Sequence, residues 1–169
     1  MNLIIWDIDN CIANDAWRIP FIDWTAADPY QRYMPYHRVC SGDQSHNMRE
    51  FEDLHERHNA DPCFITARPE AVRHMTMSWL RRHFTRSFPA ANRLLMRGND
   101  DHRASVDLKR DLLTELFAAE PEARVVLALD DRADVLTMYR QHFGIVTRLL
   151  AIHSTCAYTR PTTQPDKGH

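Results

Sequence analysis

Two pairs of aspartates follow short apolar runs at widely separated points of the chain. Asp7 and Asp9 close an apolar run near the N-terminus, and Asp130 and Asp131 follow the run 125–129. Runs of this kind are typical of buried strands in a parallel sheet, and the reactive groups of an open α/β sheet gather beyond the carboxyl ends of its strands. The two pairs therefore predict a cluster of carboxylates suited to Mg²⁺-dependent phosphoryl transfer.

This chemistry gives each aspartate a separate role. A phosphate monoester is hydrolysed in two steps when an aspartate attacks the phosphorus and water then breaks the mixed anhydride. We expect Asp7 to be this nucleophile, and Asp9 to protonate the leaving alkoxide and later deprotonate the attacking water. Mg²⁺ would be bound by Asp7, the backbone carbonyl of Asp9 and Asp130, with Asp131 as a water-mediated ligand or a residue that orients the others.

Four carboxylates and a phosphate also require positive charge, because like charges about 4 Å apart repel by several kcal/mol at intermediate dielectric. Lys109 lies near the start of a predicted helix and is expected to pair with Asp7 and with the phosphate. Thr66 ends another apolar run just before a predicted helix. We expect its hydroxyl and the neighbouring backbone N–H groups to bind the phosphate.

The composition limits the class of protein. The chain has 169 residues, 44% of them hydrophobic, which suits one globular domain. Its formal net charge is −2, so we expect no broad basic surface for duplex DNA, although a local group of arginines is enough for a nucleotide or a strand end. The four cysteines form no CxxC pair and indicate reduced thiols, and no signal sequence or membrane segment is evident. We therefore expect a cytoplasmic protein without a membrane partner; the composition predicts no oligomeric state.

Two nucleotide-binding motifs and one zinc motif are missing from the sequence. With only four glycines, the chain can form neither the P-loop GxxxxGK[ST] nor the dinucleotide-binding GxGxxG. A P-loop kinase and a Rossmann dehydrogenase are therefore excluded on motif grounds. The string His55-Glu56-Arg57-His58 is not HExxH, because the position four residues after His55 is Asn59. We expect no zinc site.

Strand and helix patterns alternate along most of the chain. Strand-like apolar segments lie at 2–8, 62–66, 93–96, 124–130 and 145–150. Helical patterns lie at 44–58, 70–83, 106–118 and 132–142, with candidate start residues Ser41, Asp43, Pro69 and Ser105. This alternation predicts an α/β domain over 1–153, in which helices cover both faces of a parallel sheet in a three-layer Rossmann-like fold. Residues 154–169 are polar and are expected to form a flexible tail.

Residues 14–42 interrupt this alternation. The segment holds three prolines and the aromatic residues Trp17, Phe21, Trp24, Tyr30, Tyr33 and Tyr36. Because it follows the first acidic pair directly, we expect a small inserted lid near the site. The aromatic side chains either stack a nucleobase or form a small core beneath a long loop, and the second interpretation is favoured for most of them.

These motifs, in this order, resemble those of the haloacid dehalogenase-like (HAD) phosphohydrolases over roughly residues 1–150. The segment Asp7-Ile8-Asp9 corresponds to the first motif of that family, Thr66 to the second, Lys109 to the third and Asp130-Asp131 to the fourth. The resemblance implies a phosphatase, since family ATPases tend to lack the second acid of the first motif. The chain departs from the family at Asn10-Cys11, where glycine and threonine are usual. Asparagine tolerates unusual backbone angles, so we expect the turn to be retained.

Residues 96–103 and 128–135 resemble, more specifically, the phosphatase domain of phage polynucleotide kinase/phosphatases. This resemblance implies removal of phosphate from a nucleic-acid end, usually the 3′ end, or from a nucleotide, without a P-loop kinase half. It implies that Arg97 and Arg103 contact the substrate and that Asp101 orients an arginine. The other expected substrate contacts are Asn10, Arg68 and Arg132. A soluble deoxynucleotide monophosphatase and a catalytically silent nucleotide- or nucleic-acid-binding module of the same fold are the alternatives.

Overall fold

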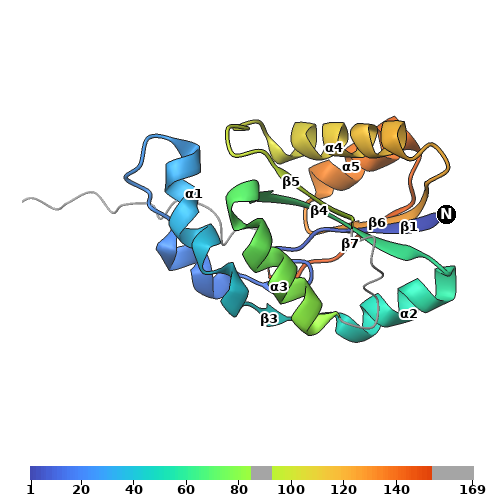
Figure 1. The fold of residues 1–169 in the computed structure, drawn as a ribbon, viewed down its shortest axis with the longest axis horizontal. Coiled ribbons are helices and arrows are strands. Elements are labelled where there is room, and N and C mark those ends of the chain that lie inside the picture. Colours follow the sequence, from blue (N-terminus) through green and yellow to red (C-terminus); the bar gives the residue numbers. More distant parts are fainter. Residues whose placement is uncertain (85–92, 154–169) are drawn as a thin grey trace, which may run out of the picture.

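A five-stranded parallel sheet forms the centre of the computed structural model, which describes residues 1–84 and 93–153 (Figure 1). The strand order is β5-β4-β1-β6-β7, and every neighbouring pair is parallel. The strands are β1 (Asn2–Trp6), β4 (Asp61–Pro69), β5 (Arg93–Arg97), β6 (Arg124–Asp130) and β7 (Thr147–Leu149). All five overlap the strand-like segments of the sequence, so the predicted sheet is confirmed. The tail expected at 154–169 lies outside the described residues.

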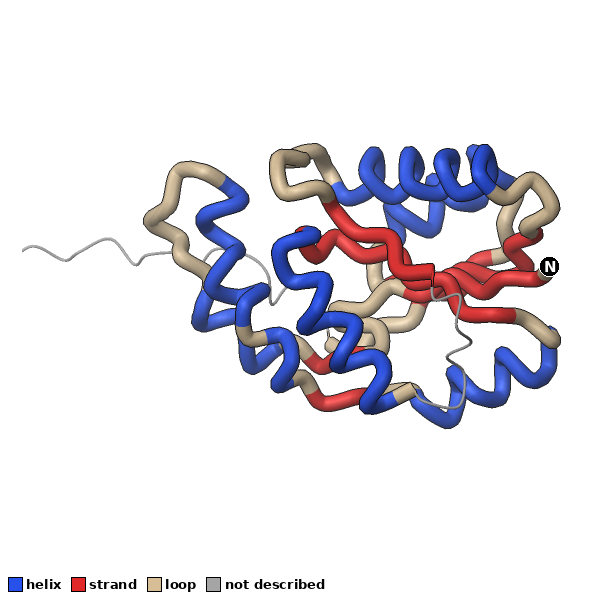
Figure 2. The backbone as a smooth tube through the Cα atoms, in the orientation of Figure 1, coloured by secondary structure: helices blue, strands red, loops and turns tan. Residues whose placement is uncertain are grey.

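Helices cover both faces of this sheet (Figures 1 and 2). The first face carries α4 (Ser105–Ala119) and α5 (Ala133–Phe143), and the other carries α2 (Met48–His58) and α3 (Arg73–His83). Alternate side chains of β1 enter the two layers: Leu3 and Ile5 belong to the core of α4 and α5, whereas Ile4 and Trp6 belong to the core of α2 and α3. Burial on both faces explains the continuous apolar run of this strand. The three-layer α/β fold is confirmed.

A buried hydrogen bond joins α2 to β1. Trp6 lies against Phe51, with ring centroids 4.8 Å apart, and its Nε1 donates to Nε2 of His55 over 2.9 Å. Because Nε2 accepts this bond, the proton of a neutral His55 is on Nδ1, which donates to the carbonyl of Ala60 over 2.7 Å. His55 is therefore a core residue that connects a helix to the central strand.

The insertion after β1 contains short helices and strands although three prolines interrupt its sequence. It begins at β2 (Ala13–Asn14), which pairs with β3 (Gln44–Ser45) in a short antiparallel ladder. Between these strands lie the 3₁₀ helices η1 (Ala16–Phe21) and η2 (Cys40–Gly42) and the helix α1 (Pro29–Arg38). The sequence indicates a proline-broken segment here, and none of its predicted helices covers α1. Pro29 takes the first helical position, where its missing N–H costs nothing, and Asp28 caps the helix by accepting from the N–H of Gln31 over 3.0 Å.

Helix starts are the least accurate part of the sequence prediction. The helix predicted over 44–58 begins only at Met48, because residues 44–45 form β3. The pattern at 70–83 opens with a 3₁₀ turn, η3 (Glu70–Val72), and Pro69 ends β4 instead of starting a helix. Ser105 is the first residue of α4 and not its cap. None of the helices within the described ranges is long and apolar enough to cross a membrane.

Candidate active site

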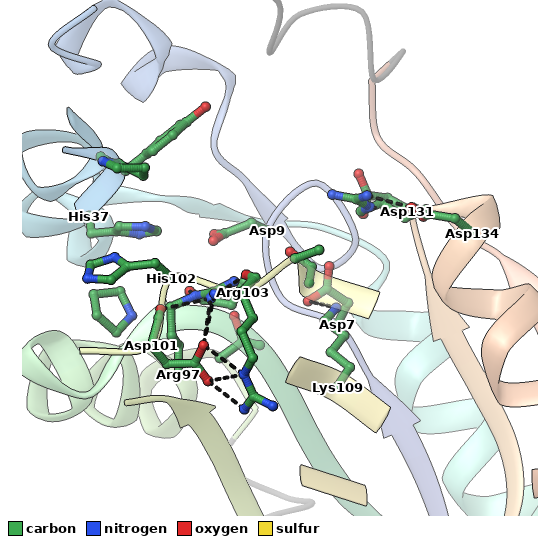
Figure 3. Close-up of a pocket in the computed structure, with 18 of the residues that line it drawn as sticks. Asp7, Asp9, His37, Arg97, Asp101, His102, Arg103, Lys109, Asp131 and Asp134 are labelled. Carbon is green, nitrogen blue, oxygen red and sulfur yellow. Dashed lines mark hydrogen bonds and ion pairs between the residues drawn. The ribbon is translucent and has the colours of Figure 1, made fainter. Parts of the chain in front are cut away.

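A cavity of about 870 Å³ lies beyond the carboxyl ends of the central strands. Figure 3 shows Asp7 and Lys109 in its middle, with His37 and His102 on one side and Asp131 on the other. The expected site residues that line it are Asp7, Asp9, Thr66, Arg97, Asp101, Arg103, Lys109, Asp131 and Arg132. Three others, Asn10, Arg68 and Asp130, are buried and do not line it.

Three strand-end carboxylates form a compact buried group. One oxygen from each of Asp7, Asp130 and Asp131 lies within 4.8 Å of the other two. Lys109 reaches the group from the first turns of α4. Its Nζ lies 2.8 Å from Oδ1 of Asp7 and donates to Oδ2 of Asp130 over 2.7 Å. The expected contact between Lys109 and Asp7 is thus present.

Burial and mutual repulsion perturb the ionisation of this group. Burial raises the pKa of Asp7 well above its ordinary value; Lys109 opposes this shift, and the neighbouring aspartates add to it. Burial likewise raises the pKa of Asp131 to about 6. Burial alone would lower the pKa of Lys109, but Asp130 and Asp7 outweigh it and hold that pKa well above its usual range. One lysine does not compensate three buried carboxylates, so the group favours a further cation.

The donor atoms of this group fit Mg²⁺. All three side chains offer carboxylate oxygens, and Mg²⁺ prefers such hard ligands over nitrogen or sulfur. Asp7 comes from the end of β1, and Asp130 and Asp131 from the end of the neighbouring β6, so the sheet itself fixes their spacing. The side chain of Asp9 is not part of the group, which leaves its backbone carbonyl as the predicted ligand.

The carboxylate of Asp9 is held by two buried arginines. Arg68 donates to Oδ1 through Nε over 3.0 Å and through Nη2 over 2.5 Å, and Nη2 of Arg18 donates to the same oxygen over 2.5 Å. Both guanidinium groups also pair with Asp43, at 2.8 Å from Nε of Arg18 and 2.9 Å from Nη2 of Arg68. Nη1 of Arg68 also donates to the hydroxyl of Thr76 over 3.3 Å, so the guanidinium of Arg68 is buried among protein groups and does not line the cavity.

This network fixes the ionisation state of Asp9. Burial alone would raise the pKa of Asp9, but Arg68 and Arg18 outweigh it and hold that pKa well below its usual range. Asp9 is one-fifth exposed and reaches the cavity as an anion. The sequence indicates Asp43 only as a helix cap and gives no signal for Arg18. The pairing of Arg18 with Asp43 depends on how the insertion folds, and no local sequence pattern predicts that fold.

Asn10 is fully buried directly behind the acidic group. Its backbone is left-handed, with φ 58°, and its Nδ2 donates to Oδ2 of Asp131 over 2.9 Å. The same side chain binds the backbone of His153, donating to its carbonyl over 3.0 Å and accepting from its N–H over 2.7 Å. The turn expected at Asn10 is therefore retained. Its side chain contacts Asp131 and the chain after β7 instead of lining the cavity.

The loop after β5 forms one rim of the cavity. Arg97 donates through Nη1 to the carbonyls of Asp101 and Arg103, over 3.0 and 2.8 Å, and through Nε to the carbonyl of Ala67 over 3.2 Å. Asp101 in turn accepts from Nε of Arg103 over 3.1 Å. Arg97 thus holds the loop in place, and Asp101 contacts Arg103, whose half-exposed guanidinium lies at the rim.

The remaining expected contacts lie at the base and the far rim. Thr66 is buried in the last part of β4, and its Oγ1 accepts from the N–H of Arg68 over 3.2 Å, so its own hydroxyl hydrogen is available to a ligand. Arg132 follows the acidic pair. Its guanidinium is 45% exposed and donates to Asp134, through Nη2 over 2.6 Å.

α1 adds uncharged rings to one side of the cavity. Tyr30, Tyr33 and His37 follow the i, i+3, i+7 spacing of one helix face, and all three line the cavity. The ring of Tyr30 lies edge-to-face with His102, with centroids 6.2 Å apart. Burial lowers the pKa of His37 to about 3, so this imidazole is neutral. The sequence gives no signal for the two histidines, because neither belongs to a motif.

The sequence matches the family model of the polynucleotide kinase PNKP phosphatase domain over residues 1–149. The chain belongs to this family. The match includes the four motifs and the loop after β5, so the resemblance to HAD-like phosphohydrolases and to the PNKP phosphatase domain is confirmed. A phosphatase domain of the HAD type follows from the PNKP family and the fold. No curated protein matches the sequence.

Solved structures share the fold of this PNKP-family chain at low sequence identity. A chain of the Pnkp1/Rnl/Hen1 RNA repair complex superposes with a TM-score of 0.62 and 20% identity, covering 88% of this chain and 42% of that one. The chain thus spans less than half of that relative. A haloacid dehalogenase-like hydrolase from Bacteroides fragilis has a TM-score of 0.60 and 12% identity, covering 92% and 91% of the two chains. The class C acid phosphatase from Bacillus anthracis has a TM-score of 0.56 and 14% identity, covering 98% and 74%.

Proposed function

We propose that the chain is a magnesium-dependent phosphomonoesterase that acts on nucleic-acid 3′-phosphate ends or on nucleotides. The observation that carries this proposal is the buried group of Asp7, Asp130 and Asp131. Lys109 forms an ion pair with Asp7 and a hydrogen bond with Asp130. The group lies at the carboxyl edge of the sheet in a chain of the PNKP phosphatase-domain family. When bound there, Mg²⁺ would offset the repulsion between the carboxylates and an incoming phosphate.

Asp7 is the proposed nucleophile. One of its oxygens pairs with Lys109, which leaves the other to attack phosphorus and form an aspartyl-phosphate. Lys109 keeps its positive charge throughout, because the pKa of this amine is raised well above its usual range by Asp130 and Asp7 despite burial. The hydroxyl of Thr66, buried at the neighbouring strand end, is the proposed donor to a phosphate oxygen.

Asp9 is the proposed acid and base. Its low pKa in the arginine network makes it an anion, which suits removal of a proton from the water that attacks the aspartyl-phosphate. Protonation of the leaving alkoxide in the first step requires Asp9 to carry a proton. We therefore infer that its contacts with Arg18 and Arg68 weaken when substrate binds.

The family and the rim of the cavity support a nucleotide-containing substrate. The family description names a polynucleotide kinase, and one structural neighbour comes from an RNA repair complex. Arg103 and Arg132 lie at the rim with half-exposed guanidinium groups, each also paired with an aspartate. These groups are the proposed contacts for phosphates next to the scissile one. A deoxynucleotide monophosphatase is the second candidate, favoured by the tyrosines of α1 in the cavity.

The test is Mg²⁺-dependent phosphate release from a matched set of esters. The set contains an oligonucleotide with a 3′-phosphate, the same strand with a 5′-phosphate, a 3′-nucleotide, a 5′-deoxynucleotide and an aryl phosphate. We expect the highest kcat/KM for the 3′-phosphorylated strand. Highest activity on a free nucleotide would favour the second candidate. Absence of release from every ester, with Mg²⁺ bound, would contradict both and favour a silent binding module.

A further inference from the structure

Of the aromatic residues that the sequence singles out in the insertion, Tyr36 is the buried one. Tyr36 is buried: its hydroxyl donates to Asp15, its carbonyl accepts from Nη1 of Arg18 over 3.3 Å, and the Arg18 guanidinium lies 4.2 Å from its ring centroid. Met34 on the same helix belongs to the main core. These two side chains fix α1 against the domain. The small core that the sequence favours for most of the aromatic residues of the insertion is thus present at Tyr36, whereas Trp17 and Phe21 are exposed.

Three tyrosines of α1 line the cavity: Tyr36, whose hydroxyl is bonded to Asp15, and Tyr30 and Tyr33. Tyr30 and Tyr33 are only partly buried, and both line the same cavity as Asp7 and Thr66. Tyr30 makes an edge contact to His102, with centroids 6.2 Å apart. Tyr33 makes edge contacts to Trp24 and to Tyr36, with centroids 6.2 and 6.3 Å apart. Neither hydroxyl has a hydrogen-bond partner among the residues that the structure describes. These contacts hold the two rings at the wall of the cavity, where their partly exposed side chains are open to a ligand.

The size and the polarity of the cavity match a ligand with two unlike parts. Its volume of about 870 Å³ lies high in the range of about 300–1,000 Å³ that is usual for small-molecule sites. Asp7 and Lys109 occupy the middle, whereas His37 and His102 lie on one side of them and Asp131 and Asp134 on the other (Figure 3). A phosphate on Asp7 therefore leaves room for a flat, apolar group on the side of α1.

We propose that Tyr30 and Tyr33 bind the nucleobase of the nucleotide that carries the scissile phosphate. Aromatic side chains bind bases by stacking, a contact that tolerates every base because each has a π-face. The proposal rests on the phosphatase function proposed above and names the part of the substrate that the insertion recognises. It makes α1 a specificity element, which the buried side chains of Tyr36 and Met34 hold against the domain.

The test compares two substrates on the same protein. Each oligonucleotide ends in a 3′-phosphate, but one has a base on its last nucleotide and the other is abasic there. We expect kcat/KM of the unmodified protein to be about 5-fold to 150-fold higher with the base, the range that corresponds to one stacking contact. In Tyr30→Leu and Tyr33→Leu this ratio should fall toward one. A variant that is less active on both substrates keeps the same ratio, so the ratio reports only the contribution of the base.

Phe21→Leu is the matched control, since Phe21 is an exposed aromatic residue of the same insertion that does not line the cavity. Its ratio should equal that of the unmodified protein. A ratio near one in the unmodified protein, or a ratio that both tyrosine variants retain, would overturn the proposal while leaving the phosphatase function in place. The same comparison on a 3′-nucleotide and deoxyribose 3-phosphate shows whether the base comes from a strand or from a free nucleotide.

A binding measurement separates this proposal from the catalytic one. If the unmodified protein releases no phosphate, an oligonucleotide ending in 2-aminopurine 3′-phosphate is titrated with it. Quenching of the 2-aminopurine fluorescence that is weaker with Tyr30→Leu and Tyr33→Leu would support base stacking without catalysis. An absence of quenching, or equal quenching by all three proteins, would overturn it.

Discussion

Asn10 shows how a single side chain ties the acidic group to a distant part of the chain. It occupies the position after the first acidic pair, where HAD-like phosphohydrolases usually have glycine, and it adopts the left-handed backbone that glycine favours. Glycine could provide this turn but not the hydrogen bonds to Asp131 and to the backbone of His153. We infer that Asn10 orients Asp131, much as outer hydrogen bonds orient metal ligands in other proteins.

Replacing Asn10 by glycine tests this inference. Asn10→Gly keeps the backbone turn and removes the donor to Asp131, so we expect the Mg²⁺ concentration for half-maximal phosphate release to rise by about 10-fold to 100-fold. Asn59→Gly is the control, because Asn59 has a left-handed backbone at the end of α2, far along the chain from the site. Equal Mg²⁺ dependence in Asn10→Gly and the unmodified protein would show that Asp131 is oriented without Asn10.

At the scale of elements, the sequence predicts the helices and strands whose patterns repeat along the chain. It does not predict contacts between segments that are distant in the sequence. The five strands and most of α3, α4 and α5 follow from apolar patterns, because burial on a sheet or a helix face repeats with a fixed period. β2 and β3 are too short for any period, and Pro35 within α1 hides a helix that tertiary contacts stabilise. No sequence pattern predicts the pairing of Arg18 with Asp43 either, because it joins the two ends of the insertion.

The bond between Trp6 and His55 predicts a pH dependence for the attachment of α2 to β1. Burial lowers the pKa of His55 below its ordinary value of 6.5, so the unfolded chain binds a proton more readily than the folded protein. The stabilisation from neutral His55 is therefore present above pH 6.5 and decreases as the pH falls below it. His55→Gln can still accept from Trp6 but does not titrate.

We therefore expect the Tm of His55→Gln to fall less than that of the unmodified protein between about pH 7.5 and pH 5.5. Thermal unfolding followed by circular dichroism measures this difference. His74→Gln, at an exposed position of α3, serves as the control for loss of a histidine at the surface. Equal pH dependence of Tm in His55→Gln and the unmodified protein would mean that His55 does not contribute to acid sensitivity.

Across the whole molecule, parallel topology brings distant motifs to one edge. β1, β4 and β6 are adjacent in the sheet, so their ends bring Asp7, Thr66 and Asp130 together from three parts of the chain. This is why strand-end residues are predictable from the sequence. The chain after β7 returns to the same edge, where the N–H of Leu150 donates to the carbonyl of Asp130 over 3.0 Å. The acidic group thus lies between the edge of the sheet and this returning segment, and Asp7 and Asp131 open to the cavity.

A buried group of three carboxylates with one lysine predicts that Mg²⁺ stabilises the whole fold. We expect Tm in millimolar Mg²⁺ to exceed Tm in EDTA, with a gain of about 2.7 kcal/mol in the free energy of unfolding when Mg²⁺ is about 100 times its Kd. In Asp131→Asn, which loses one carboxylate charge of the group, the gain should be smaller. Equal Tm values of the unmodified protein in Mg²⁺ and EDTA would contradict a metal site at these residues.

The most direct single measurement is phosphate release from a 3′-phosphorylated oligonucleotide by the unmodified protein and by Asp7→Asn, in Mg²⁺. Asparagine has nearly the same shape as aspartate, and its carbonyl can still accept from Lys109, so circular dichroism should show an unchanged fold. Loss of the nucleophile should lower kcat by about 1,000-fold or more. Release by Asp7→Asn within about tenfold of the unmodified rate would contradict an aspartyl-phosphate at Asp7.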